Sequence, residues 1–175
     1  MGKLGLGPFG VALNVSDTYL DEAAELERLG YSGIWLPGGQ IDGLGRLADL
    51  IGATTEVAVG SAIISLDVYP PEAVTGLCAQ LEATAPGRLV AGLGGLQGPQ
   101  PLRALNAYLD HLDQAAPPVP AQRRLLAALG PRKLELARVL AGLQCCGGRL
   151  PRTSPQRPGQ VKVSTAMTAS IPATA

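Results

Sequence analysis

Residues 57–93 read VAVGSAIISLDVYPPEAVTGLCAQLEATAPGRLVAGL, and this stretch decides the fold class. It begins and ends with short runs of small and branched apolar residues, at 57–66 and 89–93, which are typical of strands buried on both faces. Between them, Pro70 and Pro71 suit the first turn of a helix, and apolar residues then recur at helical spacing. A strand, a helix and a second strand in series predict a parallel pair joined by a right-handed crossover.

The same unit is repeated on both sides of this stretch. Apolar runs predict further strands at 9–15, 33–36 and 125–129. Amphipathic segments predict further helices at 19–29, 42–51, 102–112 and 131–141. Five β–α units in series predict an α/β protein with a parallel sheet, and two architectures satisfy this pattern. The units could form a doubly wound open sheet, or they could be the first five of an eight-unit barrel.

Length and composition exclude several classes of protein. The chain has 175 residues, of which 46% are hydrophobic and 16% charged, so it can bury a core and is not disordered throughout. Its 14 basic and 14 acidic residues cancel, which gives no electrostatic indication of a nucleic-acid or membrane partner. No apolar run approaches the roughly 18 residues of a membrane span, and no signal peptide opens the chain. We therefore expect a cytoplasmic protein.

The charges are distributed unevenly along the chain. All 14 acidic residues lie at or before Glu135, and five basic residues with no acidic one follow it. From about residue 145 the sequence is rich in Gly, Arg, Pro, Ser and Thr, which cannot bury enough apolar surface to order the chain. We expect a partial domain over 1–144 and a disordered tail over 145–175. One explanation of the change is a shift of reading frame near Val139.

The residues that usually carry chemistry are sparse. His111 is the single histidine and lies in a polar helical stretch, where a solvated face is the simpler interpretation. Cys145 and Cys146 are adjacent and lack zinc-site spacing, and Cys78 lies on an apolar helix stripe. The catalytic residues are therefore unknown, and no metal site is expected. An enzyme with this sequence would take its reactivity from a cofactor.

Glycines mark two places where a ligand could approach the backbone. Gly60 stands in the middle of the strand predicted at 57–66, where it indicates a bulge, a ligand against the backbone or tight packing of small residues. Residues 92–98 are glycine-rich and follow a strand, which suits either ligand approach or a turn. The GxGxxG pattern at 5–10 precedes its strand, so it does not match a dinucleotide-binding fingerprint.

Four segments in this order resemble the bacterial-luciferase-like oxidoreductases. They are residues 23–38, 54–64, 86–94 and 125–138. The last is similar to an actinobacterial subgroup that uses the deazaflavin coenzyme F-420, and together the segments span about residues 5–138. The resemblance implies a TIM (β/α)8-type barrel. Complete barrels of this type need about 250 residues, so the resemblance also implies an incomplete, truncated barrel of about five units whose activity is impaired.

The resemblance also implies where a cofactor binds. In the family a flavin or deazaflavin ring lies across the C-terminal ends of the strands, on a backbone bulge that often contains a non-prolyl cis peptide. By position, the residues implied to bind this cofactor are Leu36, Gly38, Gly60, Ser61, Ala62, Ile63, Gly92, Gly94 and Gly95. Asn14, at the end of the first strand, is implied to face the substrate.

The prediction is an oxidoreductase of the luciferase-like monooxygenase family. It transfers hydride between F-420, or alternatively FMN, and a small organic substrate, and a homo-oligomer is expected. Two other interpretations stay open. One is a non-catalytic partial barrel stabilised only by self-association, and the other is a small five-stranded nucleotide-binding protein.

Overall fold

The computed structural model describes residue 6, residues 9–127 and the backbone of residues 144–145. The helix predicted at 131–141, the proposed change of frame near residue 139 and the tail after 145 lie outside these residues. Within the described part, no helix is both long and apolar enough to cross a membrane.

Strands and helices alternate along the chain. The strands are β1 (Gly10–Ala12), β2 (Gly33–Pro37), β3 (Ala58–Ala62), β4 (Ile64–Ser65), β5 (Leu89–Gly94), β6 (Arg124–Leu126) and β7 (Gln144–Cys145). The α-helices are α1 (Tyr19–Arg28), α2 (Gly45–Gly52), α3 (Pro71–Thr84) and α4 (Pro101–Gln114). Two 3-10 turns, η1 (Gly38–Gln40) and η2 (Ala121–Arg123), follow β2 and precede β6. The strand predicted at 57–66 is thus divided into β3 and β4.

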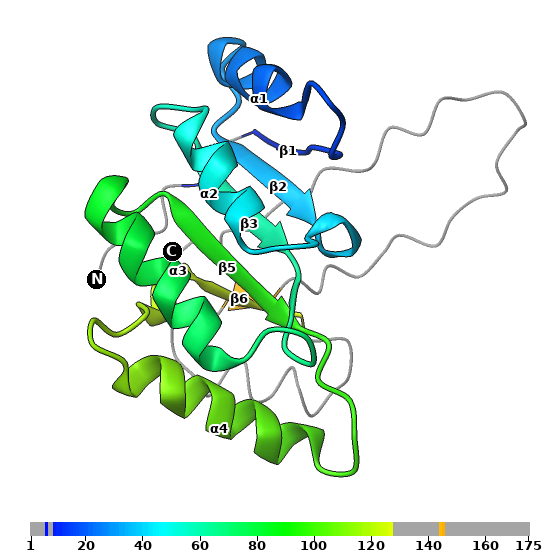
Figure 1. Cartoon of the computed structure of the whole chain (residues 1–175), viewed down its shortest axis with the longest axis vertical. Helices are drawn as coiled ribbons and strands as arrows, with labels where there is room; N and C mark the ends of the chain where they lie inside the picture. The colour runs from blue at the N-terminus through cyan, green and yellow to red at the C-terminus, as the bar shows by residue number, and fades with distance from the viewer. Residues whose placement is uncertain (1–5, 7–8, 128–143, 146–175) are drawn as a thin grey trace, which may run out of the picture.

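The order of the strands decides between the two architectures. The sheet runs β1-β2-β3-β5-β6-β7, with β4 also pairing β5, and every pair is parallel. A doubly wound sheet reverses its order at a switch point, whereas a barrel adds each new strand beside the previous one. Sequential order therefore confirms the α/β fold of the barrel type. In Figure 1 the arrowheads of β2, β3 and β5 point to the same edge.

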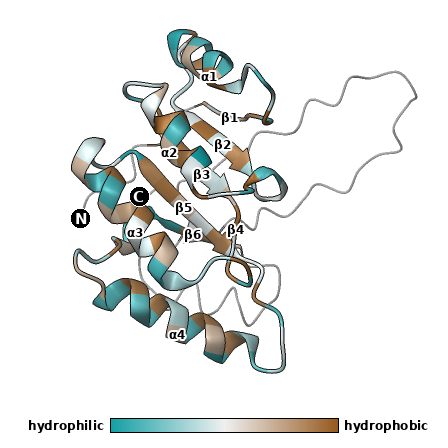
Figure 2. Cartoon of the chain, viewed as in Figure 1, coloured by the Kyte–Doolittle hydropathy of each residue, from teal (hydrophilic) through white to brown (hydrophobic). Residues whose placement is uncertain are grey.

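The hydrophobic core lies between the sheet and the helices. Ile34, Val59 and Leu89 occupy one row across three strands and are all buried. They pack with buried side chains of the helices, such as Leu47 of α2 and Val74 of α3. Helices α2, α3 and α4 lie over the same face of the sheet (Figure 1), and their apolar stripes alternate with polar ones (Figure 2). Helices on one face of the sheet are typical of the outer helical layer of a barrel.

The opposite face of the sheet carries Trp35. A Cβ atom added to Gly60 would lie 2.3 Å from Cζ3 of this indole, and one added to Gly10 would lie 3.0 Å from its Nε1. Trp35 therefore lies flat across neighbouring strands because both positions lack a side chain. The glycine in the middle of the third predicted strand makes room for a tryptophan, so tight packing explains this position.

At the N-terminal ends of the strands, Glu27 and Arg88 hold the loop that precedes β3. The Glu27 carboxylate accepts hydrogen bonds from the backbone N–H groups of Thr55, Glu56 and Val57, at 2.6–2.8 Å, and from the Thr55 hydroxyl. Arg88 donates to the carbonyls of Ile51, Thr54 and Val57. One side chain thus satisfies the donors of this loop and the other satisfies its acceptors.

These contacts change the pKa of Glu27. Partial burial opposes ionisation of Glu27, but the hydrogen bonds from Glu56, Thr55 and Val57 outweigh it and lower the pKa to about 2. A carboxyl group with a lowered pKa in the folded state stabilises the protein above its unfolded pKa, near 4.5. That contribution disappears as the pH falls from 4.5 towards 2.

We predict that Glu27→Gln lowers the free energy of unfolding by about 1–2 kcal/mol at pH 7, because an amide keeps only one of the two acceptor oxygens. The difference between wild type and variant should shrink at pH 3, and urea unfolding at the two pH values measures it. Glu56→Gln is the control, because Glu56 contributes its backbone N–H to this contact. An equal difference at both pH values would contradict the prediction.

Candidate functional site

A β-bulge interrupts the pairing of β3 and β4 with β5. Gly60 lies opposite Val90, whereas Ile64 lies opposite Leu93. Residues 61–63 of one strand therefore face residues 91–92 of the other, so one residue is inserted. A bulge is therefore present and lies directly after Gly60, whereas Gly60 itself makes room for Trp35.

The bulge reverses the alternation of the side chains that follow it. Gly60 belongs to the row of Trp35, on the face away from the helices. After the inserted residue, Ile64 is directed to the helix side and is fully buried in the core. Without the insertion, Ile64 and Gly60 would share one face, because strand side chains alternate with a period of two.

Ser61 replaces the missing ladder contacts at the bulge. Its hydroxyl donates to the carbonyl oxygen of Gly92 at 3.0 Å and accepts from the N–H of the same residue at 2.9 Å. Ser61 is 1% exposed, so water cannot substitute for these bonds. The implied cofactor-binding residue Ser61 thus uses its hydroxyl to satisfy the backbone of β5.

Three of the predicted glycines pack against the bulge. A Cβ atom on Gly38 would lie 2.4 Å from the Ile63 carbonyl oxygen, and one on Gly92 would lie 1.9 Å from that of Ser61. A Cβ atom on Gly94 would lie 2.5 Å from Cδ1 of Ile63. Atoms of the bulge therefore occupy the space that a side chain would need at each of these glycines. A cis peptide bond joins Ala62 and Ile63, at the position to which the resemblance assigns one.

The structure thus brings most of the predicted residues to one place. Gly38 follows β2, Ile63 follows β3, and Gly94 ends β5, so the C-terminal ends of three neighbouring strands meet at Ile63. Ala62 and Ile63 are half-buried, which leaves part of the bulge accessible. We call this surface, made by Gly38, Ala62, Ile63 and Gly94, the strand-end platform.

Two predicted residues have other roles. The side chain of Leu36 is fully buried in the helix-side core, so it does not face the strand-end platform. Gly95 has a φ of 88°, and its Cβ position would lie 3.0 Å from Oγ of Ser65. Gly95 therefore allows the chain to turn after β5, because other residues rarely adopt this conformation.

Asn14 lies at the same edge, beyond β1, and is held by Gln40. The Nε2 group of Gln40 donates to Oδ1 of Asn14 at 2.8 Å, and Oε1 of Gln40 accepts from the backbone N–H of Val15. Gln40 is not among the site residues predicted from the sequence. A polar residue directly after Gly38 and Gly39, where a strand ends, was the pattern that could have identified it.

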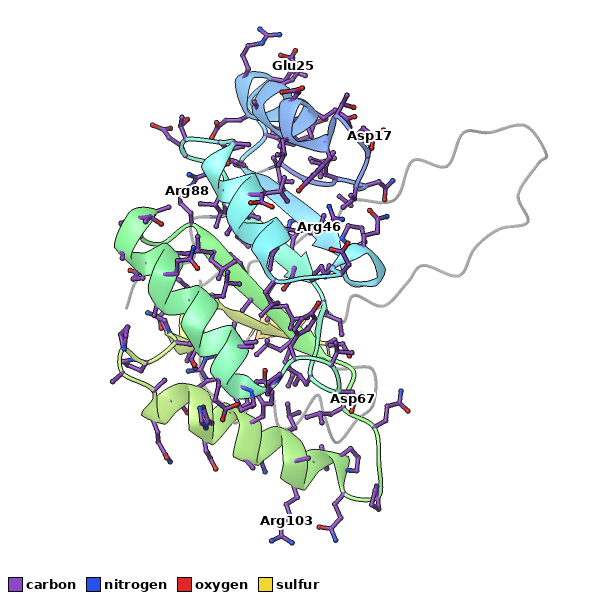
Figure 3. All side chains as sticks on the ribbon, viewed as in Figure 1. Asp17, Glu25, Arg46, Asp67, Arg88 and Arg103 are labelled. Carbon is purple, nitrogen blue, oxygen red and sulfur yellow. The ribbon has the colours of Figure 1, made fainter. Side chains whose placement is uncertain are left out.

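One ion pair lies near this edge. Arg46 forms an ion pair with Asp42, and its guanidinium lies 5.8 Å from the centre of the Tyr19 ring. The hydrogen bond with Arg46 lowers the pKa of Asp42. Figure 3 shows Asp67 near the arrowhead of β5 and Arg88 near its start, at the opposite end of the strand. The positive charge of Arg46 is thus neutralised by Asp42.

Neither Cys78 nor His111 belongs to this site. Burial raises the pKa of the Cys78 thiol to about 11, so it is protonated near neutral pH. It lines a cavity of about 240 Å³ between α3, the outer face of β5 and the segment 117–120. His111 of α4 lies 3.6 Å from Glu72 of α3. The cavity lies on the helix side of the sheet, whereas the strand-end platform lies at its C-terminal edge.

Comparisons with solved structures find proteins of the same fold. The structure of apo-MsnO8 matches with a TM-score of 0.57 and 19% identity, covering 78% of this chain and 53% of that one. The coenzyme F-420-dependent tetrahydromethanopterin reductase from Methanopyrus kandleri matches with a TM-score of 0.54 and 17% identity, at the same coverage. No profile of a known protein family matches the sequence, and no curated protein does.

These similarities establish the fold class. The chain has an α/β fold of the (β/α)8-barrel type, and it spans about half the length of the two solved chains. At identities of 19% and 17%, the match extends to the fold alone.

We predict that Gly92→Ala destabilises the protein severely, because its methyl group would overlap the Ser61 carbonyl oxygen and displace the bulge. Ser61→Ala should cost about 1–3 kcal/mol, because it leaves the N–H and C=O of Gly92 without partners. Thermal and urea unfolding of the purified variants measure both effects.

Gly39→Ala and Ser65→Ala are the matched controls. A Cβ atom on Gly39 meets no atom within 4 Å, and no hydrogen bond of the Ser65 hydroxyl is found among the described residues. Equal stability of Gly92→Ala and Gly39→Ala would show that the bulge does not occupy the space at Gly92.

Proposed function

We propose that the chain is an oxidoreductase that binds a flavin-type ring on the strand-end platform. F-420 is the proposed cofactor and FMN the alternative. The observation that carries the proposal is the packing of the bulge into the spaces at Gly38, Gly92 and Gly94. This packing makes a backbone surface at the C-terminal ends of parallel strands, where enzymes of the barrel type place their active sites.

The described residues suit the ring of such a cofactor better than they suit its anionic tail. Ala62 and Ile63 offer an apolar surface and backbone groups, which suit a flat heteroaromatic ring. The anionic tail of F-420 or FMN needs cationic or N–H donors, and Arg46 at this edge is already paired with Asp42. The proposal therefore concerns the ring, because the ion pair with Asp42 leaves Arg46 unavailable to the tail.

The protein's own role would be to position and shield the ring. Near the strand-end platform the described chain places amide side chains, Asn14 and Gln40, and no histidine or cysteine. When bound, the ring supplies the hydride chemistry. The similarity of fold to a reductase that depends on coenzyme F-420 supports this proposal, and so does the resemblance of the sequence. A small organic substrate and a homo-oligomeric state belong to the same proposal.

We predict saturable, micromolar binding when the purified full-length chain is titrated with F-420 or FMN and followed by absorbance and fluorescence. Gly38→Ala should weaken binding at least about tenfold, because its methyl group would displace the Ile63 backbone. Gly39→Ala, next to it in an open position, should bind like the wild type.

The outcome also separates the remaining interpretations. Absence of binding to both cofactors, together with association that increases with concentration, would contradict the proposal and favour a non-catalytic partial barrel. Tight binding of a different nucleotide would contradict it in favour of a nucleotide-binding protein.

A further inference from the structure

Three neighbouring groups at the ends of β1 and β2 form a chain of hydrogen bonds. The backbone N–H of Val15 donates to Oε1 of Gln40, and Nε2 of Gln40 donates to Oδ1 of Asn14. Gln40 is half-buried and Asn14 is exposed, so the chain runs from the backbone outwards to solvent.

The orientation of both amides follows from chemistry alone. A backbone N–H can only donate, so the atom of Gln40 that faces Val15 must be its oxygen. The other end of the Gln40 amide is then its NH₂ group, which can only donate. The atom of Asn14 that faces Gln40 must therefore be an oxygen as well, which leaves the NH₂ group of Asn14 outermost. No described residue accepts a hydrogen bond from that NH₂ group.

Asn14 lies in a continuous row with the strand-end platform. Gln40 follows Gly38 in η1, and the Cβ position of Gly38 is in contact with Ile63. Because neighbouring strands lie about 4.8 Å apart, β1 is roughly 10 Å from β3 across β2. A small molecule over the end of β2 could therefore reach both Asn14 and a ring on the bulge.

We infer that Gln40 fixes the Asn14 amide with its NH₂ group outermost, and that this NH₂ group binds an acceptor oxygen of the substrate, as found in a carbonyl or carboxylate. This inference rests on the proposed function, because it names the substrate chemistry of the same site. Gln40 is a positioning residue in this arrangement, and Asn14 makes the contact. The backbone N–H of Val15 orients the Gln40 amide, and the Gln40 amide in turn orients the Asn14 amide, so Val15 determines that the outer group of Asn14 is a donor.

Two shape-matched probes test the inference on the ¹⁵N-labelled full-length chain. Benzoate carries acceptor oxygens, and benzamidinium carries donor nitrogens on the same ring. We predict that benzoate shifts the side-chain NH₂ resonances of Asn14 saturably, that benzamidinium does not, and that Asn14→Asp identifies these resonances by removing them. Asn14→Asp should still accept from Gln40 and fold normally, but should lose benzoate binding.

The decisive variant leaves Asn14 unchanged. In Gln40→Glu one carboxylate oxygen still accepts from Val15, and the other requires Asn14 to turn its NH₂ group inwards and its oxygen outwards. Benzoate affinity should fall at least about tenfold, as expected for the loss of a charge-assisted hydrogen bond, and benzamidinium should then bind. Gln97→Glu adds the same charge at an exposed position after β5, and it should leave the preference for benzoate unchanged.

The outcomes separate this inference from the proposed function. Equal benzoate affinity in wild type and Gln40→Glu, or no saturable shift of the Asn14 resonances with benzoate, would overturn the inference even if FMN binds. The predicted reversal in a chain that binds neither F-420 nor FMN would support the orientation of Asn14 by Gln40 and contradict the ring-binding proposal.

Discussion

The hydroxyl of Ser61, bonded to both the N–H and the C=O of Gly92, is the interaction on which the rest of the site depends. An inserted residue would normally leave unpaired backbone groups inside the sheet, at a cost of about 1–3 kcal/mol for each buried group. Here the Ser61 hydroxyl makes the two hydrogen bonds that backbone groups of a neighbouring strand would otherwise make to Gly92. The register of β5 with β6 therefore continues past the bulge without interruption.

The two ends of the sheet are held by different means. At the N-terminal ends, Glu27 and Arg88 fix a loop with charged side chains that satisfy its backbone donors and acceptors. At the C-terminal ends, glycines allow backbone to pack on backbone, as at Gly38 and Ile63. The first arrangement stabilises the loop through ionised groups, and the second brings strand ends close enough to make a common surface. This division agrees with the placement of barrel active sites at C-terminal strand ends.

Much of the fold could be predicted from the sequence, because strands and helices follow local periodicity. Periodicity alone could not give the order of the strands, since nothing in the repeat at 57–93 distinguishes a barrel from an open sheet. The barrel was predicted by the resemblance of four segments to the luciferase-like oxidoreductases, and the strand order confirms it. The resemblance implies that Leu36 binds the cofactor, whereas its alternation with Trp35 places it in the core. The contact between Asn14 and Gln40 joins residues 26 apart in sequence, so a local pattern can point to Gln40 but not to its partner.

Trp35 gives the strand-end platform a spectroscopic property. It is the single tryptophan of the chain, and its indole lies against Gly60, the residue directly before the bulge. Its emission therefore reports on one place in the molecule, without interference from a second indole. Flavin-type rings absorb in the range where tryptophan emits, so a ring seated at Ile63 would quench this fluorescence by energy transfer. The residue that fills the sheet face beneath the bulge is thus also an intrinsic probe of its occupancy.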